Sequence, residues 1–560
     1  MNDPGSRRLV WALGLGVAVL FAYALFQDSR RPIVRAGLGA VRFLARPTVA
    51  LACLALALLP RAMVPLTWNE APDEAPSIVF VLLDSVRLDD VGWGGSERPT
   101  TPRLDALARR GVAFHQAVSQ APWTKPSVAT LLTGLTPSHH GATGRFSALA
   151  EGHRTLAEAF TSAGWRTFAA SSNPNVTRLF GFDQGFTGFY ERVGAPAEEL
   201  IEEARKALHP GEPSERPFFL YLHLNDAHYP YDPPAVSRTA TGELKVRGRF
   251  NRSGRYPLLD GATETAFRTG GGSSFSAEDV EAMRLAYDEE ILYLDDQVGA
   301  LVERLLAVRD DVLVVIVSDH GEEFLEHGDL GHGHSLYDEL VRVPLQVAWS
   351  DGLGERLRLT PGTHGGQVRS MDLTPTLLEI AGIPGPLGSP PPMGESLLPL
   401  LRGEGRRATA VPPTEAADEI GLGAEDRLAF SETDYLGSPL SGPPGPLRGL
   451  RTPRAKLVIS DPWFEPTAGR TWLFDLAADP GERVNLASRR PALVETMLRT
   501  LEASPWLVQR DLRGITEVQL SDEQREGLAA LGYVGDDLDA LLHTAPSFAP
   551  GAVPWVTDGD

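Results

Sequence analysis

Short apolar runs alternate along the middle of the chain with segments whose apolar residues recur every three or four positions. The runs at 77–84 and 311–319 are rich in Val, Ile and Leu, a pattern typical of strands buried on both faces of a sheet. Residues 101–110, 155–163 and 277–308 show helical spacing instead. This alternation predicts an α/β fold, with a doubly wound, mostly parallel sheet that helices cover on both faces.

Each of the two strands ends in side chains that commonly bind metals. Asp84 ends the first run, and Asp319 ends the second, directly before His320. Carboxylates and imidazoles are both ligands of divalent metal ions. Because parallel strands end at the same edge of a sheet, we expect the three side chains to share one ion there.

Thr124 is the candidate nucleophile. It precedes Pro126, which falls near the first turn of a predicted helix, and a helix N-terminus offers its dipole and N–H groups to an anion. A hydroxyl is a weak nucleophile at its free pKa, and coordination by a divalent metal is one way to activate it. We expect Thr124 to be the fourth metal ligand and to attack an ester. The alternative is that Thr124 only caps the helix, beside ordinary strand-end carboxylates.

Several motifs between residues 77 and 534 resemble those of the sulfatase branch of the alkaline-phosphatase superfamily, and they occur in that family's order. They are LDSVRLDD at 83–90, TPRLDALA at 101–108, HLNDAHYPY at 223–231, SDHGEE at 318–323, EHG at 326–328, VPL at 343–345 and LFDLAADPGERVNL at 473–486. The resemblance implies an alkaline-phosphatase-like fold with a smaller C-terminal α+β subdomain. It also implies a hydrolase of sulfuric or phosphoric esters.

The nucleophile position departs from that of the formylglycine sulfatases. Those enzymes have Cys or Ser followed by x-Pro-x-Arg, whereas this chain has TKPSV at 124–128. Threonine lacks the primary carbon needed to become formylglycine, and Val128 replaces the arginine that holds the modified residue. The resemblance therefore implies the chemistry of the phosphate-ester members, in which an unmodified Thr124 forms a phospho- or sulfo-threonine intermediate.

The ligand set also differs from that of the sulfatases. Ser85 follows Asp84 where sulfatases have a second aspartate, and His320 stands where they often have asparagine. One carboxylate fewer and one imidazole more shift the preference from calcium toward manganese or zinc, so Mn, Zn and Ca all remain candidates for the one divalent metal. A second metal site would need other ligands, for which Asp226, His327 and His334 are the candidates.

Further residues are expected to contact the ester. His228 matches the family histidine that contacts the ester or protonates the leaving group, and His332 stands where many sulfatases have a substrate-binding lysine. Asn173 is a further candidate for substrate binding. Lys125 is expected to be a surface charge or at most a contact at the substrate's rim. The remaining histidines are expected to be packed or solvated: His139, His140, His223 and His327.

The N-terminal part predicts a membrane anchor. Residues 9–26 form an uncharged run of eighteen residues, about 27 Å long as a helix and close to the hydrocarbon thickness of a bilayer. A second apolar run at 47–68 predicts a second span if Arg61 snorkels to the interface. Five arginines lie between the runs and two before the first, which places that loop in the cytoplasm and the catalytic part in the periplasm or outside. No convincing cleavage site follows the first run, so a retained anchor is favoured.

Charge and cysteine content limit the partners. The whole chain carries −21 although residues 1–70 hold eight arginines against three acidic residues, so the acidic excess lies in the remainder. Such a surface excludes nucleic acid as a partner. The single cysteine, Cys53, excludes an intrachain disulfide. The expected partners are the membrane and a small-molecule, glycan or lipid ester substrate.

Composition divides the chain into four parts: a membrane anchor at 1–70, a catalytic domain at 75–390, a smaller subdomain at 391–510 and a helix with a tail at 511–560. Within the catalytic domain, residues 237–276 are rich in Gly, Arg and Ser and predict an irregular insertion near the site. In the subdomain, 449–460 and 471–476 resemble antiparallel strands, and 491–503 a helix packed on them.

Three classes of function fit these patterns. The first is a hydrolase of sulfate or phosphate esters, the second a membrane transferase that passes a phospho-headgroup through Thr124, and the third a non-catalytic binding protein on a sulfatase fold. The hydrolase is favoured because transferases of this superfamily typically have more than two spans. The complete set of Asp84, Thr124, Asp319 and His320 argues against the non-catalytic alternative.

Overall fold

The computed structural model describes residues 71–72, 74–208, 216–235, 245–253, 275–384, 390–405, 421, 426–434, 446–460, 470–506, 518 and 521. All of them belong to the unit Asn69–Asp560, the second of the two compact units of the chain. The predicted anchor at 1–70 and nearly all of the predicted helix and tail at 511–560 lie outside the described residues. Within the described ranges, no helix is long and apolar enough to cross a bilayer.

The main sheet has nine strands in the order β10-β2-β9-β6-β1-β5-β3-β4, with β11 paired to β2. They are β1 (Ser77–Leu83), β2 (Val112–Val118), β3 (Arg166–Ser171), β4 (Gly188–Glu191), β5 (Phe218–Leu224), β6 (Val312–Ser318), β9 (Arg342–Trp349), β10 (Gly362–His364) and β11 (Val368–Arg369). Strand β1 is parallel to both its neighbours, β5 and β6. Strand β9 runs antiparallel to β2 and β6. The sheet is therefore mixed but mostly parallel, as the apolar runs predict.

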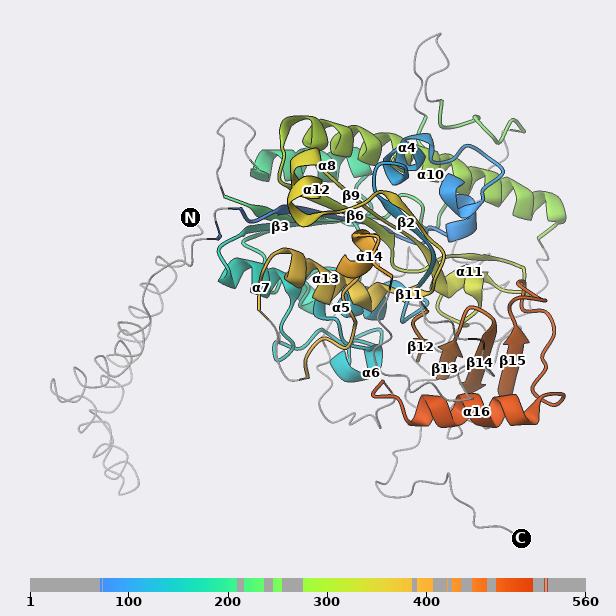
Figure 1. Cartoon of the computed structure of the whole chain (residues 1–560). Helices are drawn as coiled ribbons and strands as arrows, with labels where there is room; N and C mark the ends of the chain where they lie inside the picture. Colours follow the sequence, from blue (N-terminus) through green and yellow to red (C-terminus); the bar gives the residue numbers. More distant parts are fainter. Residues whose placement is uncertain are drawn as a thin grey trace, which may run out of the picture. The chain divides into compact units, whose positions relative to one another are not determined.

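Helices cover both faces of this sheet. They are α4 (Pro102–Ala108), α5 (Thr124–Thr133), α6 (Pro137–His140), α7 (Leu156–Ser162), α8 (Ala197–Leu208), α10 (Ala277–Val308), α11 (Asp338–Val341), α12 (Asp351–Leu357), α13 (Leu373–Ile380) and α14 (Leu398–Leu401), with short 3-10 turns at η2 (Leu88–Asp90), η3 (Gly92–Gly94), η4 (Arg178–Phe180) and η5 (Ser370–Asp372). Alternate residues of β1 enter different cores. Ile78, Phe80 and Leu82 pack with α5, α7 and α13, whereas Val79 and Val81 pack with α4, α8 and α10. Figure 1 shows these two helical layers on opposite sides of the sheet.

Two of the predicted helices begin at capping boxes. Ser276 accepts a hydrogen bond from the backbone of Asp279 at the start of α10, and Thr155 does the same from Glu158 at α7. In each case the acidic side chain accepts in return from the cap residue's N–H. The capping box explains why α10 begins at Ala277, as predicted.

A smaller antiparallel sheet contains β12 (Ala429–Thr433), β13 (Leu447–Arg451), β14 (Ala455–Ser460) and β15 (Thr471–Asp475), and α16 (Pro491–Glu502) packs on it. The prediction of one strand at 449–460 is wrong, because the segment is a hairpin. Its turn is closed by a hydrogen bond from Thr452 N to Ala455 O and another from Ala455 N to Thr452 Oγ1. Pro453 lies inside this turn, where its missing N–H is not needed for pairing.

Ion pairs connect the smaller sheet to α11, the helix that precedes β9 of the main sheet. Asp338 at the start of α11 pairs with Arg451 and with Lys456 at 2.6 Å each. Lys456 also pairs with Glu482 at 2.8 Å. Paired and hydrogen-bonded charges tolerate burial, so these groups connect β13 and β14 to the start of α11.

Candidate metal centre and active site

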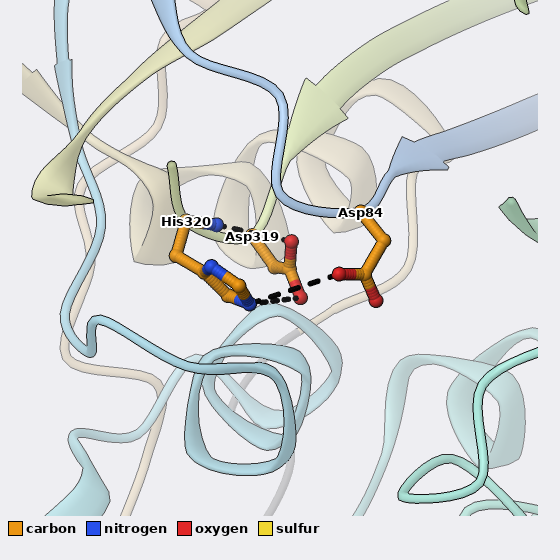
Figure 2. Close-up of side chains that lie close together, drawn as sticks. All are labelled: Asp84, Asp319 and His320. Atoms are coloured by element: carbon orange, nitrogen blue, oxygen red, sulfur yellow. Dashed lines mark hydrogen bonds and ion pairs between the residues drawn. The ribbon is translucent and has the colours of Figure 1, made fainter. Parts of the chain in front are cut away.

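The candidate metal ligands lie side by side because the two central strands are in register. Leu83 of β1 pairs with Ser318 of β6, so the next residues, Asp84 and Asp319, leave the sheet together. One ligand atom each of Asp84, Asp319 and His320 lies within 4.8 Å of the others, and all three residues are buried. Figure 2 shows the three side chains converging from the two strand ends. The imidazole Nε2 is 3.4 Å from an oxygen of Asp319 and 3.8 Å from one of Asp84.

Thr124 lies beside this cluster because it is the first residue of α5, and α5 begins next to His320. Its Oγ1 is 3.2 Å from His320 Nε2. Ser127, in the first turn of α5, donates a hydrogen bond of 2.8 Å to the backbone oxygen of Asp319. The helix is thus tied to the strand end, with its N-terminal dipole directed at the cluster.

The orientation of His320 leaves one ring nitrogen for a ligand. Its Nδ1 is 2.9 Å from the backbone oxygen of Gly321, which only accepts, so Nδ1 carries the proton. Nε2 then presents its lone pair toward Thr124 and the two carboxylates. A hydrogen bond of this kind from the distal nitrogen is how metal-binding histidines are commonly held.

The Asp84 carboxylate is held on both oxygens. Oδ2 accepts a hydrogen bond from Asn173 Nδ2 and contacts His223 Nε2, both at 2.7 Å, and Oδ1 accepts from Ser85 Oγ at 2.9 Å. Ser85 takes a φ of 60°, a left-handed conformation that a serine adopts at some cost in strain. The other amide hydrogen of Asn173 goes to Asn225 at 2.8 Å. Asn173, a candidate for substrate binding, is therefore engaged in holding Asp84.

The two buried carboxyl groups have opposite pKa shifts. Burial alone would raise the pKa of Asp84, but the hydrogen bond from His223 and the charge of His228 hold this pKa below its ordinary value. Burial and then the charge of Asp84 raise the pKa of Asp319 well above its ordinary value. Two carboxyl groups this close resist carrying two negative charges, and a bound divalent cation would relieve their repulsion.

A second group of imidazoles adjoins the cluster. The ring of His332 lies 4.2 Å from that of His320 and 5.0 Å from that of His228, centroid to centroid. Burial and then the neighbouring imidazoles lower the pKa of His332 well below its ordinary value. Glu322, which sequence patterns do not single out, contacts His332 Nδ1 at 2.9 Å and accepts from the Tyr231 hydroxyl at 2.8 Å. Glu322 thereby orients the ring of His332, which lies next to the ring of His228.

The structure corrects the prediction for Lys125. The side chain is fully buried, and its Nζ donates to the backbone oxygens of Gly144 and Arg145 at 3.3 and 2.5 Å. The ammonium group also lies 3.4 Å from the ring centroid of Phe180, and burial lowers its pKa well below the ordinary value. The loop before α7 and the turn η4 therefore cover a position that helical periodicity alone leaves exposed.

The predicted second metal site is not formed. Asp226 accepts from the N–H of Ala197 at the start of α8, whereas His334 contacts Glu323 and His327 contacts Glu339. Among the described residues, the one group of side chains that meets the geometry of a metal site is the group formed by Asp84, Asp319 and His320.

The mostly parallel sheet brings two carboxylates, an imidazole and a hydroxyl together at its strand ends, an arrangement suited to ester hydrolysis. Residues 76–383 match the Sulfatase family. This match covers more than half of the chain, so the protein belongs to the sulfatase family and is an ester hydrolase.

Several known proteins are similar over most of their length. The choline-sulfatase of Rhizobium meliloti (strain 1021) is 26% identical over 486 residues, covering 77% of this chain and 87% of that protein. Arylsulfatase K of Rattus norvegicus is 23% identical, covering 77% and 78%. The crystal structure of the phosphonate monoester hydrolase of Agrobacterium radiobacter superposes with a TM-score of 0.59 at 20% identity, covering 80% of this chain and 100% of that one. At that identity, the structural match establishes the fold.

Proposed function

We propose that this protein is a metal-dependent, membrane-anchored hydrolase that cleaves sulfate or phosphate esters with Thr124 as its nucleophile. The observation that carries the proposal is the distance of 3.2 Å between Thr124 Oγ1 and His320 Nε2, within a buried cluster that also contains Asp84 and Asp319. A hydroxyl in this position at a helix N-terminus is placed to meet an anionic ester.

The residues present fit a divalent metal. Two carboxylates, one imidazole lone pair and one hydroxyl converge, and Asp319 Oδ2 is buried without a hydrogen bond in the described part of the chain. The ligands would be Asp84, Thr124, Asp319 and His320. When bound, such an ion lowers the pKa of the hydroxyl and withdraws charge from the ester. The mixed oxygen and nitrogen donors favour manganese or zinc over calcium.

The reaction follows from the placement of the other groups. The Thr124 hydroxyl loses its proton to solvent, its Oγ forms a bond to sulfur or phosphorus while the bond to the leaving oxygen breaks, and protonated His228 donates a proton to that oxygen. His332 is oriented by Glu322, burial and the neighbouring imidazoles hold its pKa low, and its ring faces the ester's remaining oxygens. In the second step His228 accepts a proton from water, and the water oxygen forms a bond to sulfur or phosphorus as the bond to Thr124 Oγ breaks. Oγ takes up a proton from solvent, which restores the Thr124 hydroxyl.

The reactivity of a threonine nucleophile and the substrates of similar proteins together suggest the class of substrate. Similar proteins include a choline-sulfatase and a phosphonate monoester hydrolase, so sulfate, phosphate and phosphonate esters of small molecules, glycans or lipids are the candidates. An unmodified threonine attacks phosphorus as well as sulfur. We infer further that the catalytic part faces the periplasm or the outside, because the arginine excess lies between the two N-terminal apolar runs.

The test is a substrate panel on the purified protein. Aryl sulfate, phosphate monoester, phosphodiester and phosphonate ester are assayed with metal analysis of the same preparation. Thr124→Ala should lose most of the turnover, and mass spectrometry of wild-type protein quenched during turnover should find sulfate or phosphate on the peptide containing Thr124. Full activity of Thr124→Ala would show that another residue attacks, and undiminished activity of fully metal-stripped protein would refute the metal dependence.

A further inference from the structure

The terminal strand of the smaller sheet, β12, lies against the main domain. All five of its residues are buried, and its neighbour in the sheet is β13. Successive side chains of a strand point to opposite faces. Phe430 packs with α16 in the core of the smaller sheet, whereas Ala429 packs with Val118 at the end of β2. Ser431 and Thr433 share the face of Ala429, so two hydroxyl groups of this strand point toward the main domain.

Strand β12 contacts the segment that leads into the helix of the proposed nucleophile. Ser431 Oγ donates a hydrogen bond of 2.6 Å to the backbone oxygen of Ser119. The N–H of Glu432 donates one of 2.9 Å to the backbone oxygen of Gln120. Thr124, the first residue of α5, follows shortly after these two acceptors. The smaller sheet therefore holds the chain in place just before the residue that is proposed to attack.

Buried hydroxyl groups connect this segment in turn to the strand end of the metal ligands. Ser119 Oγ lies 3.0 Å from Ser127 Oγ in the first turn of α5 and 2.9 Å from the backbone oxygen of Ala121. Ser127 Oγ donates a hydrogen bond of 2.8 Å to the backbone oxygen of Asp319. A series of contacts thus runs from Ser431 through Ser119 and Ser127 to the end of β6, so a change at β12 can reach the start of α5.

The second hydroxyl of β12 contacts the segment that carries the imidazole beside the ester. Thr433 is buried, and its Oγ1 donates a hydrogen bond of 2.9 Å to the backbone oxygen of Gly333. Gly333 directly follows His332, whose ring lies 4.2 Å from that of His320 and 5.0 Å from that of His228, centroid to centroid. This hydrogen bond therefore fixes the backbone one residue away from a side chain of the site.

We propose that Ser431 and Thr433 are positioning residues of the active site. The first hydroxyl holds the chain before Thr124, and the second holds the chain beside His332. A displacement of about 1 Å can cost about 10²-fold in rate, so two hydrogen bonds from one buried strand are enough to set the attacking group and the ester-binding group relative to each other. The smaller sheet then serves catalysis although the proposed metal ligands all come from the main domain.

This inference rests on the proposed ester hydrolysis, and its first test is the steady-state kinetics of single variants on an ester that the wild type hydrolyses. Ser431→Ala should lower kcat about tenfold with KM unchanged, because Thr124 is displaced while the contacts to the bound ester remain. Thr433→Val should raise KM about tenfold with little change in kcat, because His332 faces the ester's oxygens before and during the reaction. Ser431→Thr and Thr433→Ser keep the hydroxyl groups and should each recover most of the loss.

A matched control comes from the far side of the same subdomain. Thr496→Val removes a buried hydroxyl that donates to the backbone oxygen of Ala492 within α16, and it should leave kcat and KM as in wild type. Folding of every variant is checked by circular dichroism and thermal unfolding. Wild-type kcat and KM in folded Ser431→Ala and Thr433→Val would show that β12 only stabilises the sheet, which would overturn the proposal.

Hydrogen–deuterium exchange separates a failure of this inference from a failure of the proposed function, because it needs no turnover. Ser431→Ala should speed amide exchange in the peptide that covers residues 119–127, and Thr433→Val in the peptide that covers 331–335, relative to wild type and Thr496→Val. Exchange as slow as in wild type in both peptides would overturn the inference. Faster exchange in a protein whose wild type hydrolyses no ester of the panel would refute the proposed hydrolysis and still show that β12 holds both segments.

Discussion

His223 Nε2 lies 2.7 Å from Asp84 Oδ2, and both side chains are fully buried. The pairing follows from the sheet, because β5 is the parallel neighbour of β1 and His223 stands opposite Leu82. On its other side, His223 Nδ1 contacts the Tyr221 hydroxyl at 3.0 Å. A carboxylate fixed in this way keeps its second oxygen in one direction, so in the proposed metal site His223 would position Asp84 as a ligand.

Removing this support should weaken metal binding. His223→Ala should reduce the affinity of the metal-free protein for Mn²⁺ or Zn²⁺ by about 10–100-fold, as is typical of residues that orient metal ligands. His223→Gln should recover part of the affinity, because its amide can still donate to Asp84. Calorimetry measures this without any turnover. His153→Gln, outside the site, is the control, and wild-type affinity in folded His223→Ala would show that His223 only fills space.

Because Asp84 and Asp319 lie close together, Asp319→Asn should stabilise the metal-free protein and destabilise the metal-bound protein. Asp319→Asn removes the repulsion between Asp84 and Asp319, so the metal-free variant should unfold at a higher temperature than metal-free wild type, by about 1 °C for each kcal/mol gained. With saturating metal the order should reverse, because the variant has lost a ligand and binding stabilises only the form that binds. Thermal unfolding with and without chelator checks both signs. A variant that is less stable in both conditions would contradict the prediction.

The strand-end part of the site could be predicted from sequence because it depends on local pattern and one general rule. Asp84 and Asp319 each follow an apolar run, and parallel strands end at the same edge of a sheet. Thr124 precedes a helix whose start is marked by Pro126. These features predict that Asp84, Asp319 and Thr124 lie close together. The register of β1 and β6 explains why Asp84 and Asp319 are direct neighbours.

The supporting residues could not be predicted, because their roles depend on strand order and on distant loops. His223 lies inside an apolar run and has the pattern of a packed histidine; only the order β3-β5-β1 brings it to Asp84. Lys125 occupies the second position of α5, where it is buried by residues 144–145 and by Phe180. Strand β12 is short, and its place beside β13 is likewise a tertiary effect.

Asp226 should make the stability of the protein depend on pH. Burial raises the pKa of Asp226 to about 7, above the ordinary value near 3.9 in the unfolded chain. The native state therefore holds the Asp226 proton up to a higher pH than the unfolded chain does. The protonated carboxyl adds its full contribution to the free energy of unfolding below about pH 4, and this contribution is lost as pH rises through 7. The total loss is about 4 kcal/mol. Asp226→Asn should remove that loss. Urea unfolding of metal-free wild type and variant at pH 5 and pH 8 should show a larger advantage of the variant at pH 8; equal differences at both values would exclude the shift.

The arginine distribution predicts the orientation of the chain in a membrane. Because five arginines lie between the two N-terminal apolar runs and two before the first, the part after residue 70 should face away from the cytoplasm. Protease added to intact spheroplasts of expressing cells should then digest this part, as detected with an antibody against it. A cytoplasmic marker protein serves as the control for intact membranes. Protection until the cells are lysed would reverse the predicted orientation.

The last prediction separates the roles of Thr124 and His228 by the leaving group. His228 lies beside His332, with its Nδ1 2.6 Å from the Tyr229 backbone oxygen, and in the proposed reaction its other ring nitrogen protonates the departing oxygen. His228→Ala should lower kcat by about 10²–10⁴-fold for alkyl esters and much less for nitrophenyl esters, whose leaving group needs no proton. Thr124→Ala should lower kcat for both kinds of ester, since attack is lost whatever departs, whereas Thr124→Ser should keep measurable activity. The comparison is a plot of log kcat against leaving-group pKa for each variant. A slope for His228→Ala equal to that of wild type would remove His228 from proton transfer and leave it a role in binding the ester.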